Sequence, residues 1–285
     1  MAVPEPASPF PQIHGHRGCR GLLPENTLPA FCRAVELGVD VLELDIVVSA
    51  DHQLVVSHEP WMSATICRTP EGRPIEPHEQ LAHNLYALPY ARIREYDCGS
   101  IRHPLFPEQR PVAACKPLLR EVIETVDALT ARLRLPPVQF SIEVKSSPAG
   151  DGIWHPAPAG FLALLFAQLH SLRLFPRTTL LCFDKRILQL AREQEPALRL
   201  CLLVEDDRPI QDHLQELGFH PEVLGPDFRL LTSEVVTGLR QLNIALVPWT
   251  VNTPADLENI RSFRPLGITT DYPDRLLAMR AKERT

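Results

Sequence analysis

No apolar run in the sequence approaches the roughly 18 residues that a membrane-spanning helix needs. The first twelve residues contain neither a basic segment nor an apolar core, so we expect no secretory signal and interpret them as a short proline-rich tail. The apolar fraction of 45% and the charged fraction of 22% are those of an ordinary globular protein. We therefore expect a soluble protein without stable membrane insertion.

Cysteine pairs of the C-x-x-C type are absent as well. The seven cysteines are scattered along the chain, at positions 19, 32, 67, 98, 115, 182 and 201. An odd number without paired spacing argues against a disulfide framework and against a cysteine zinc site. We expect reduced thiols and a cytoplasmic location.

Clusters of basic residues are also missing. The 29 lysines and arginines are dispersed among 35 aspartates and glutamates, which gives a net charge of −6. Nucleic-acid-binding domains carry a basic patch or stripe, and none is visible here. We expect a small-molecule substrate and no nucleic-acid partner.

The 285 residues alternate short β-rich runs with longer segments of helical period, a pattern typical of parallel strands joined by crossover helices. Eight strands are predicted, at 12–15, 39–48, 138–145, 179–183, 198–204, 222–225, 244–250 and 267–270. Helices are predicted near 27–37, 117–133, 159–172, 185–195, 210–217, 233–242, 254–261 and 273–281. Eight such units predict an α/β fold, a (β/α)8 TIM barrel that forms a single domain over 1–285.

Residues 59–116 break this alternation. The segment carries many prolines and charges, has little sustained periodicity, and separates the second strand from its helix. Long βα loops are where such barrels carry their variable functional parts. We predict an insertion after the second strand that lies over the C-terminal mouth of the barrel.

The first candidate site follows the first strand, in His14-Gly15-His16-Arg17-Gly18. Barrel enzymes place catalytic groups at the ends of their strands, and an arginine fork suits a phosphate group. The glycines allow the backbone to approach a ligand closely. A plain glycine turn with incidental histidines stays open as an alternative.

Acidic residues interrupt two of the predicted strands. Glu43 and Asp45 are two residues apart on one strand, so both side chains point to the same face. Two carboxylates about 5 Å apart repel each other by roughly 3 kcal/mol at an effective dielectric of about 20. Glu143 ends another strand beside Lys145 and adds a third acid, although a simple ion pair would also explain these two. Three hard oxygen ligands favour Mg²⁺ or Ca²⁺.

Further candidates lie near other strand ends. His58 ends a short extended run, 53–58, that follows the acidic strand closely enough to face the same mouth. Trp249 could stack on a glycerol or head group, or it could simply be core. Asp271 is explained equally well as the N-cap of the last helix.

The motifs H-R-G, P-E-N-T, G-V-D-x-L-E-L-D, L-V-V-x-H, I-E-V-K, P-W-T-V-N and G-I-T-T-D-Y-P-D occur in this order between positions 16 and 274. Their order resembles the glycerophosphodiester phosphodiesterase family. The resemblance implies metal-dependent hydrolysis of glycerophosphodiesters to glycerol 3-phosphate and an alcohol. It implies general acid-base catalysis by His16 and His58, a divalent cation on Glu43, Asp45 and Glu143, phosphate contacts from Arg17 and Lys145, and substrate contacts from Phe183, Trp249 and Asn252.

Two other functions stay open. A phospholipase C- or lysophospholipase D-like enzyme of the same barrel type would act on lipid and need an apolar rim, for which Trp61-Met62 is a slight indication. A phosphate-binding protein without turnover is the non-enzyme alternative, and the presence of both histidines and all three acids speaks against it. His58 precedes Glu59, where the family usually has aspartate, so the resemblance implies the reaction class and leaves the head group open.

Overall fold

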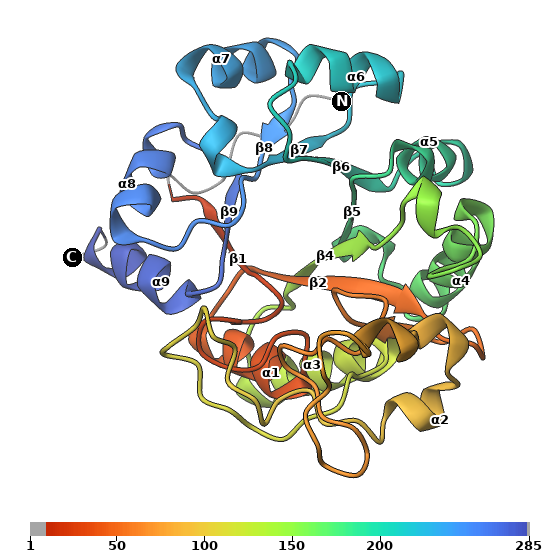
Figure 1. Cartoon of the computed structure of the whole chain (residues 1–285). Helices are drawn as coiled ribbons and strands as arrows, with labels where there is room; N and C mark the ends of the chain where they lie inside the picture. Colours follow the sequence, from red (N-terminus) through yellow and green to blue (C-terminus); the bar gives the residue numbers. More distant parts are fainter. Residues whose placement is uncertain (1–9, 284–285) are drawn as a thin grey trace.

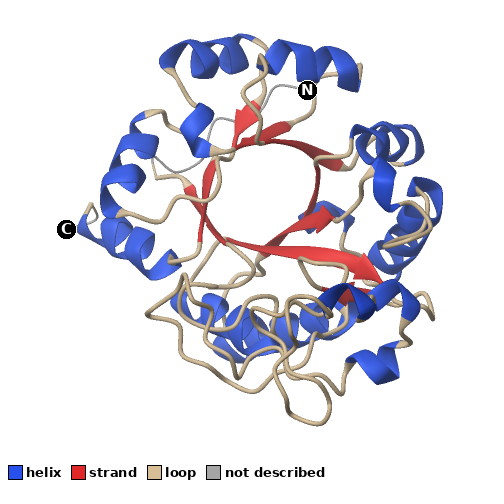
Figure 2. Ribbon diagram, viewed as in Figure 1, coloured by secondary structure: helices blue, strands red, loops and turns tan. Residues whose placement is uncertain are grey.

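The computed structural model describes residues 10–283, so most of the segment interpreted as an N-terminal tail lies outside the described residues. Figures 1 and 2 show a ring of strands enclosed by helices. The strands are β1 (Gln12–Gly15), β2 (Val41–Val48), β3 (Leu54–Val56), β4 (Gln139–Val144), β5 (Thr178–Cys182), β6 (Arg199–Val204), β7 (Val223–Pro226), β8 (Ala245–Leu246) and β9 (Gly267–Thr270). The helices are α1 (Leu28–Leu37), α2 (Tyr90–Ile93), α3 (Leu119–Leu133), α4 (Pro158–Ser171), α5 (Lys185–Gln194), α6 (Ile210–Leu217), α7 (Ser233–Gln241), α8 (Pro254–Ser262) and α9 (Pro273–Lys282).

Eight parallel strands form the barrel, in the order β8-β7-β6-β5-β4-β2-β1-β9. Backbone hydrogen bonds bring its two edges together, from Leu266 N to Leu246 O (2.9 Å) and from Thr269 N to Pro248 O (3.0 Å). The predicted (β/α)8 fold is confirmed. Strand β3, the extended run before His58, stays outside the ring and pairs antiparallel with β2.

Strand β8 is shorter than predicted, covering 245–246 instead of 244–250. Pro248 has no N–H to give to a ladder, so regular pairing cannot continue through it. None of the helices within residues 10–283 is both long and apolar enough to cross a bilayer.

The barrel strands divide their side chains between two environments because successive residues point to opposite faces. On β2, the outward-facing Leu42, Leu44 and Ile46 are fully buried against the helices, in the main hydrophobic core. The alternate positions Glu43 and Asp45 therefore face the barrel interior. One strand thus anchors the fold and presents two acids to the site.

Replacing Phe31 tests the packing of the helices on the barrel. Its side chain on α1 is fully buried, so replacing it with alanine should lower the free energy of unfolding by about 3–5 kcal/mol. Leu105 is 73% exposed, and its change to alanine should stay within about 0.5 kcal/mol. Denaturant unfolding of both variants measures this, and equal losses would contradict the assigned packing.

The segment 59–116 forms a smaller unit on the β1–β2 side of the barrel (Figure 1). It has a hydrophobic cluster of its own, which includes Met62, Leu85 and Ile93 and packs on β2 and β3. Gln109 Nε2 donates to Arg20 O (2.7 Å), so the segment also contacts the loop after β1. The short helix α2 within it was not predicted, because four residues are too few to show a helical period.

Candidate active site

The loop after β1 is folded back tightly over the barrel. Gly18 has a φ of +89°, and a Cβ there would lie 2.8 Å from the backbone of Ala30, so only glycine fits without strain. Arg17 also has a positive φ, of 48°. This conformation turns the Arg17 N–H inward, where it donates to Glu43 Oε2 (2.8 Å).

His16 is fixed by an acid from the far end of the chain. Its Nδ1 lies 2.6 Å from Asp271 Oδ1, and its Nε2 lies 3.9 Å from Glu43 Oε2. Burial lowers the pKa of His16 more than Asp271 raises it. Burial raises the pKa of Asp271, but His16, Arg20 and Asn252 outweigh it and bring that pKa to about 2. A carboxylate only accepts hydrogen bonds, so Nδ1 carries the proton and Nε2 is left as a free acceptor.

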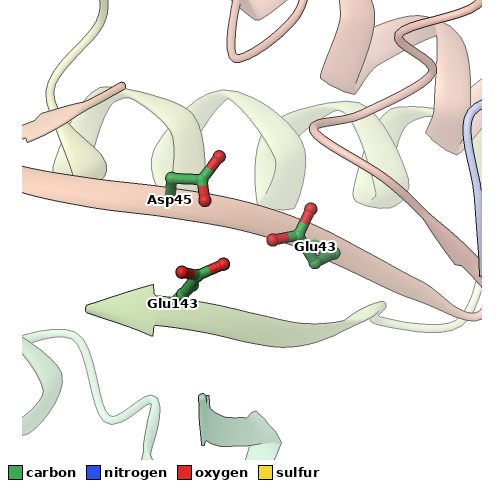
Figure 3. Close-up of side chains that lie close together, drawn as sticks. All are labelled: Glu43, Asp45 and Glu143. Carbon is green, nitrogen blue, oxygen red and sulfur yellow. The ribbon is translucent and has the colours of Figure 1, made fainter. Parts of the chain in front are cut away.

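Three carboxylates converge inside the barrel, as Figure 3 shows, two from β2 and one from β4. One oxygen from each of Glu43, Asp45 and Glu143 lies within 4.8 Å of the others, and all three residues are buried. Asp45 and Glu143 are register partners on adjacent strands. The shared face predicted from the spacing on β2 therefore brings the predicted metal-ligand set into one cluster.

Burial and neighbouring charges shift the pKa values of the three carboxyl groups. Burial raises the pKa of the Glu43 carboxyl well above its ordinary value, and repulsion from Asp45 and Glu143 adds to this. Burial also raises the pKa of Glu143, against the opposing effect of Lys145. Burial acts in the same direction on Asp45, but Arg17 and Lys145 outweigh it and hold the pKa of that carboxyl well below its usual range. A bound cation would relieve the repulsion.

Two cations border the acids. Lys145 Nζ lies 2.6 Å from Glu143 Oε1 and 3.6 Å from Asp45 Oδ1. Arg17 Nε lies 3.3 Å from Asp45 Oδ2, while its Nη1 binds Glu25 Oε1 at 2.7 Å. Three inward carboxylates thus face two cations, and Arg17 is shared with Glu25, so negative charge is in excess.

The second histidine approaches from outside the ring. His58 follows β3, and its Nδ1 lies 2.8 Å from Glu59 Oε1. Burial raises the pKa of Glu59, but the His58 contact outweighs it and brings that pKa to about 2, so the glutamate accepts this hydrogen bond. The His58 side chain is 32% exposed, against 12% for His16. Glu59 thus contacts Nδ1 of His58 as Asp271 contacts Nδ1 of His16.

A cavity of about 460 Å³ joins these groups. Nine of the ten predicted site residues lie at this cavity. Of these nine, the described residues lining the cavity include His16, Arg17, Glu43, His58, Glu143, Lys145, Phe183 and Trp249, with Asp45 directly behind Arg17 and Lys145. Phe183 and Trp249 meet edge to face with centroids 5.7 Å apart.

Asn252 lies elsewhere. Its Nδ2 donates to Asp271 Oδ2 (2.7 Å), and its Oδ1 accepts from the Asp271 backbone N–H (2.9 Å). It does not line the cavity formed by the described residues. The structure therefore gives Asn252 a contact with Asp271, while its predicted substrate contact stays a prediction.

Three further residues of the site were missed or misassigned from the sequence. The N-cap of α9 is Tyr272, so the N-cap interpretation of Asp271 is wrong, and its side chain binds His16 instead. Asn26 donates to Asp45 Oδ2 (2.8 Å), and Glu25 accepts from Arg17. Alternation along β9 was the signal for Asp271, because it extends the inward face of Gly267 and Thr269.

The family model of the glycerophosphoryl diester phosphodiesterase family matches residues 16–275. The chain belongs to this family. It is therefore a phosphodiester hydrolase, and the cavity is its candidate active site. A glycerophosphodiester phosphodiesterase of Bacillus altitudinis is 27% identical over 273 residues, which cover 94% of this chain and 98% of that protein.

Solved structures resemble the chain over nearly its whole length. A putative glycerophosphoryl diester phosphodiesterase from Silicibacter pomeroyi DSS-3 has a TM-score of 0.85 at 28% identity, covering 95% of this chain and 94% of that one. A phosphodiesterase from Oleispira antarctica has a TM-score of 0.74 at 19% identity, covering 95% and 97%. That protein was solved in complex with the product sn-glycerol-3-phosphate, and at this identity the likeness shows the shared fold alone.

Proposed function

We propose that the protein hydrolyses glycerophosphodiesters to glycerol 3-phosphate and an alcohol, with a divalent cation and two histidines. The observation that carries the proposal is the meeting of His16, His58 and the acidic cluster around one cavity. These groups come from β1, β2, β4 and the segment after β3, so no single local motif accounts for their convergence.

The residues present fit a divalent cation. Glu43, Asp45 and Glu143 offer three hard oxygen ligands, and burial together with their mutual repulsion raises the pKa of Glu43. Oxygen donors of this kind favour Mg²⁺ or Ca²⁺ over softer metals. A cation held there would act as a Lewis acid on a phosphoryl oxygen.

Arg17 and Lys145 complete the phosphate environment. Both cations border the acidic cluster, and both line the cavity. The Arg17 fork is held by Glu25 and Asp45 before any substrate arrives, so little reorganisation accompanies binding. Charge that develops on the phosphoryl oxygens in the transition state is stabilised by these fixed groups.

The two histidines take opposite roles. His16 lies deeper, and its free Nε2 accepts the proton of the nucleophile, a glycerol hydroxyl neighbouring the phosphate. His58 lies nearer the opening with its Nδ1 held by Glu59, and it gives a proton to the departing alcohol, which leaves a cyclic phosphodiester of glycerol. Water then opens this ring to glycerol 3-phosphate: His58, now deprotonated, accepts the proton of the water, and His16 returns its proton to the glycerol oxygen. The edge-to-face pair of Phe183 and Trp249 forms the apolar wall against which the glycerol carbons pack.

A panel of glycerophosphodiesters tests this function directly. The purified protein with Mg²⁺ or Ca²⁺ should release glycerol 3-phosphate together with choline, ethanolamine or glycerol. A coupled dehydrogenase assay measures glycerol 3-phosphate, and chromatography measures the alcohol. Release of free glycerol with a phosphorylated head group would overturn the proposed cleavage site.

The lipid alternative finds little support in the segment that should carry its rim. Met62 is fully buried, and Trp61 packs edge to face on Trp154 with centroids 5.2 Å apart. Met62 is therefore not available as a rim residue, and Trp61, which is half-buried, is packed against a neighbouring tryptophan. A water-soluble diester is the substrate class that this geometry favours.

Asp271 is a positioning residue for His16. An Asp271→Asn change keeps the size of the side chain but replaces an acceptor oxygen with a donor, so the imidazole loses the partner that fixes its tautomer. We expect kcat to fall by about 10²-fold, less than on loss of His16 itself, with a small change in KM. Asp256→Asn on α8 is the matched control, and equal kcat values for both variants would contradict this role.

A further inference from the structure

The cavity does not end at the acidic cluster. Its lining continues to residues at the starts of the strands, at the opposite end of the barrel from His58. Gln12, Gln139 and Arg199 are the first residues of β1, β4 and β6, and all three line the cavity. We call the part formed by Gln12, His14, Gln139, Thr179 and Arg199 the barrel floor.

The side chains of the barrel floor are polar and lack protein partners. None of the five makes a side-chain hydrogen bond or ion pair with another residue in the described part of the chain. His14 is only 5% exposed, yet neither of its ring nitrogens has a hydrogen-bond partner. Buried polar groups in proteins are nearly always satisfied, so the ring of His14 requires a ligand or water, while the other four side chains are half-buried and open to the cavity.

Arg199 gives the floor its charge. It is the sole charged side chain among the floor residues that the structure describes. Alternation on β6 places it on the same face as Cys201 and Leu203, which lie in the interior cluster of the barrel. The neighbouring acid Glu222 is already bound to Arg192 at 2.7 Å. Arg199 is half-buried, and a guanidinium that lines a cavity without a counter-ion favours an anionic ligand.

The ring of His14 occupies space that a glycine leaves open. A Cβ at Gly267 would lie 2.4 Å from His14 Nε2, so the glycine at the start of β9 leaves the space that the ring fills. Burial and the nearby Arg199 lower the pKa of His14 to about 3, so the imidazole is neutral and keeps one N–H to donate. Amide, hydroxyl and imidazole donors thus surround one guanidinium.

We propose that the barrel floor is a second binding site, specific for a small oxyanion such as a phosphate or carboxylate group, with Arg199 as its cation. The site is separate from the acidic cluster, which repels free anions unless a metal is bound. The oxyanion is either free in solution or part of a substrate that extends down the cavity, and the second source rests on the proposed function.

Calorimetric titration of the full chain with inorganic phosphate, in excess EDTA, isolates the floor. Without metal, the charges of Glu43, Asp45 and Glu143 repel phosphate from the neighbouring Arg17 and Lys145, so phosphate should bind at the floor alone. The Arg199→Gln variant should bind at least about tenfold more weakly, because it loses a charge-assisted contact. Arg199→Lys should recover part of the affinity, and Arg33→Gln on α1, which changes an exposed arginine, should bind as the parent does.

Turnover of two matched substrates separates the sources. Glycerophosphoserine and glycerophosphoethanolamine differ by one carboxylate. A selective fall in kcat/KM for the serine compound in Arg199→Gln would mean that the substrate supplies the anion. Unchanged selectivity together with lost phosphate binding would mean that a free anion occupies the floor.

Either of two results would contradict the proposal. If phosphate binds neither protein in EDTA, or binds Arg199→Gln as tightly as the parent, the floor holds only water and the inference fails. The melting temperature of Arg199→Gln shows whether the variant is folded. Because the variant loses an unpaired cation, its melting temperature should equal or exceed that of the parent. The titration needs no turnover, so its result stands apart from that of the proposed reaction.

Discussion

The single variants His16→Ala and His58→Ala should each have a kcat lowered by about 10²–10⁴-fold, which is the usual contribution of one general acid or base. The structure gives each imidazole a carboxylate partner on Nδ1, and both histidines line the cavity. Initial-rate measurement of glycerol 3-phosphate release from one diester checks both variants.

The double variant sharpens this test. If the two histidines act on the same reaction, the loss in the double variant should be far smaller than the product of the single losses. His170→Ala changes an exposed histidine on α4 and should keep the parent rate. Retention of near-normal rates by either single variant, with an unchanged melting temperature, would contradict the mechanism.

Removal of the metal should have a comparable effect. A Lewis acid at a phosphoryl oxygen supplies several kcal/mol, so EDTA should lower the rate by about 10²-fold or more, and Mg²⁺ or Ca²⁺ should restore it. In Glu43→Gln one of three anionic ligands is lost, and half-maximal activity should need a higher metal concentration.

The matched control for the ligand variant is Glu193→Gln, an exposed acid on α5. It should show the metal dependence of the parent. Full activity in EDTA, or a metal titration of Glu43→Gln that overlays that of the parent, would show that the acidic cluster has another purpose.

The barrel was predictable because its signals are local. Alternation along β2 alone distinguishes Leu42 and Leu44, which pack outward, from Glu43 and Asp45, which point inward. The period of two also extends to Glu143 on β4. Strand ends, acid spacing and motif order therefore indicated the fold and most of the site.

The parts that the sequence did not indicate depend on register and on irregular chain. His16 and Asp271 are 255 positions apart and meet because β1 pairs with β9, a register that no local pattern encodes. The contacts of Gln109 with the loop after β1 arise from a segment without periodicity. The barrel floor was missed because Gln12 and Arg199 are ordinary strand-start residues until the ring closes.

A crystal of the protein soaked with Mn²⁺ and glycerol 3-phosphate tests the central claim most directly, through the anomalous signal of manganese. One peak should lie among the carboxylates of Glu43, Asp45 and Glu143, with the phosphate bound to it between Arg17 and Lys145. A strong peak elsewhere, with these three carboxylates unbound, would contradict the account.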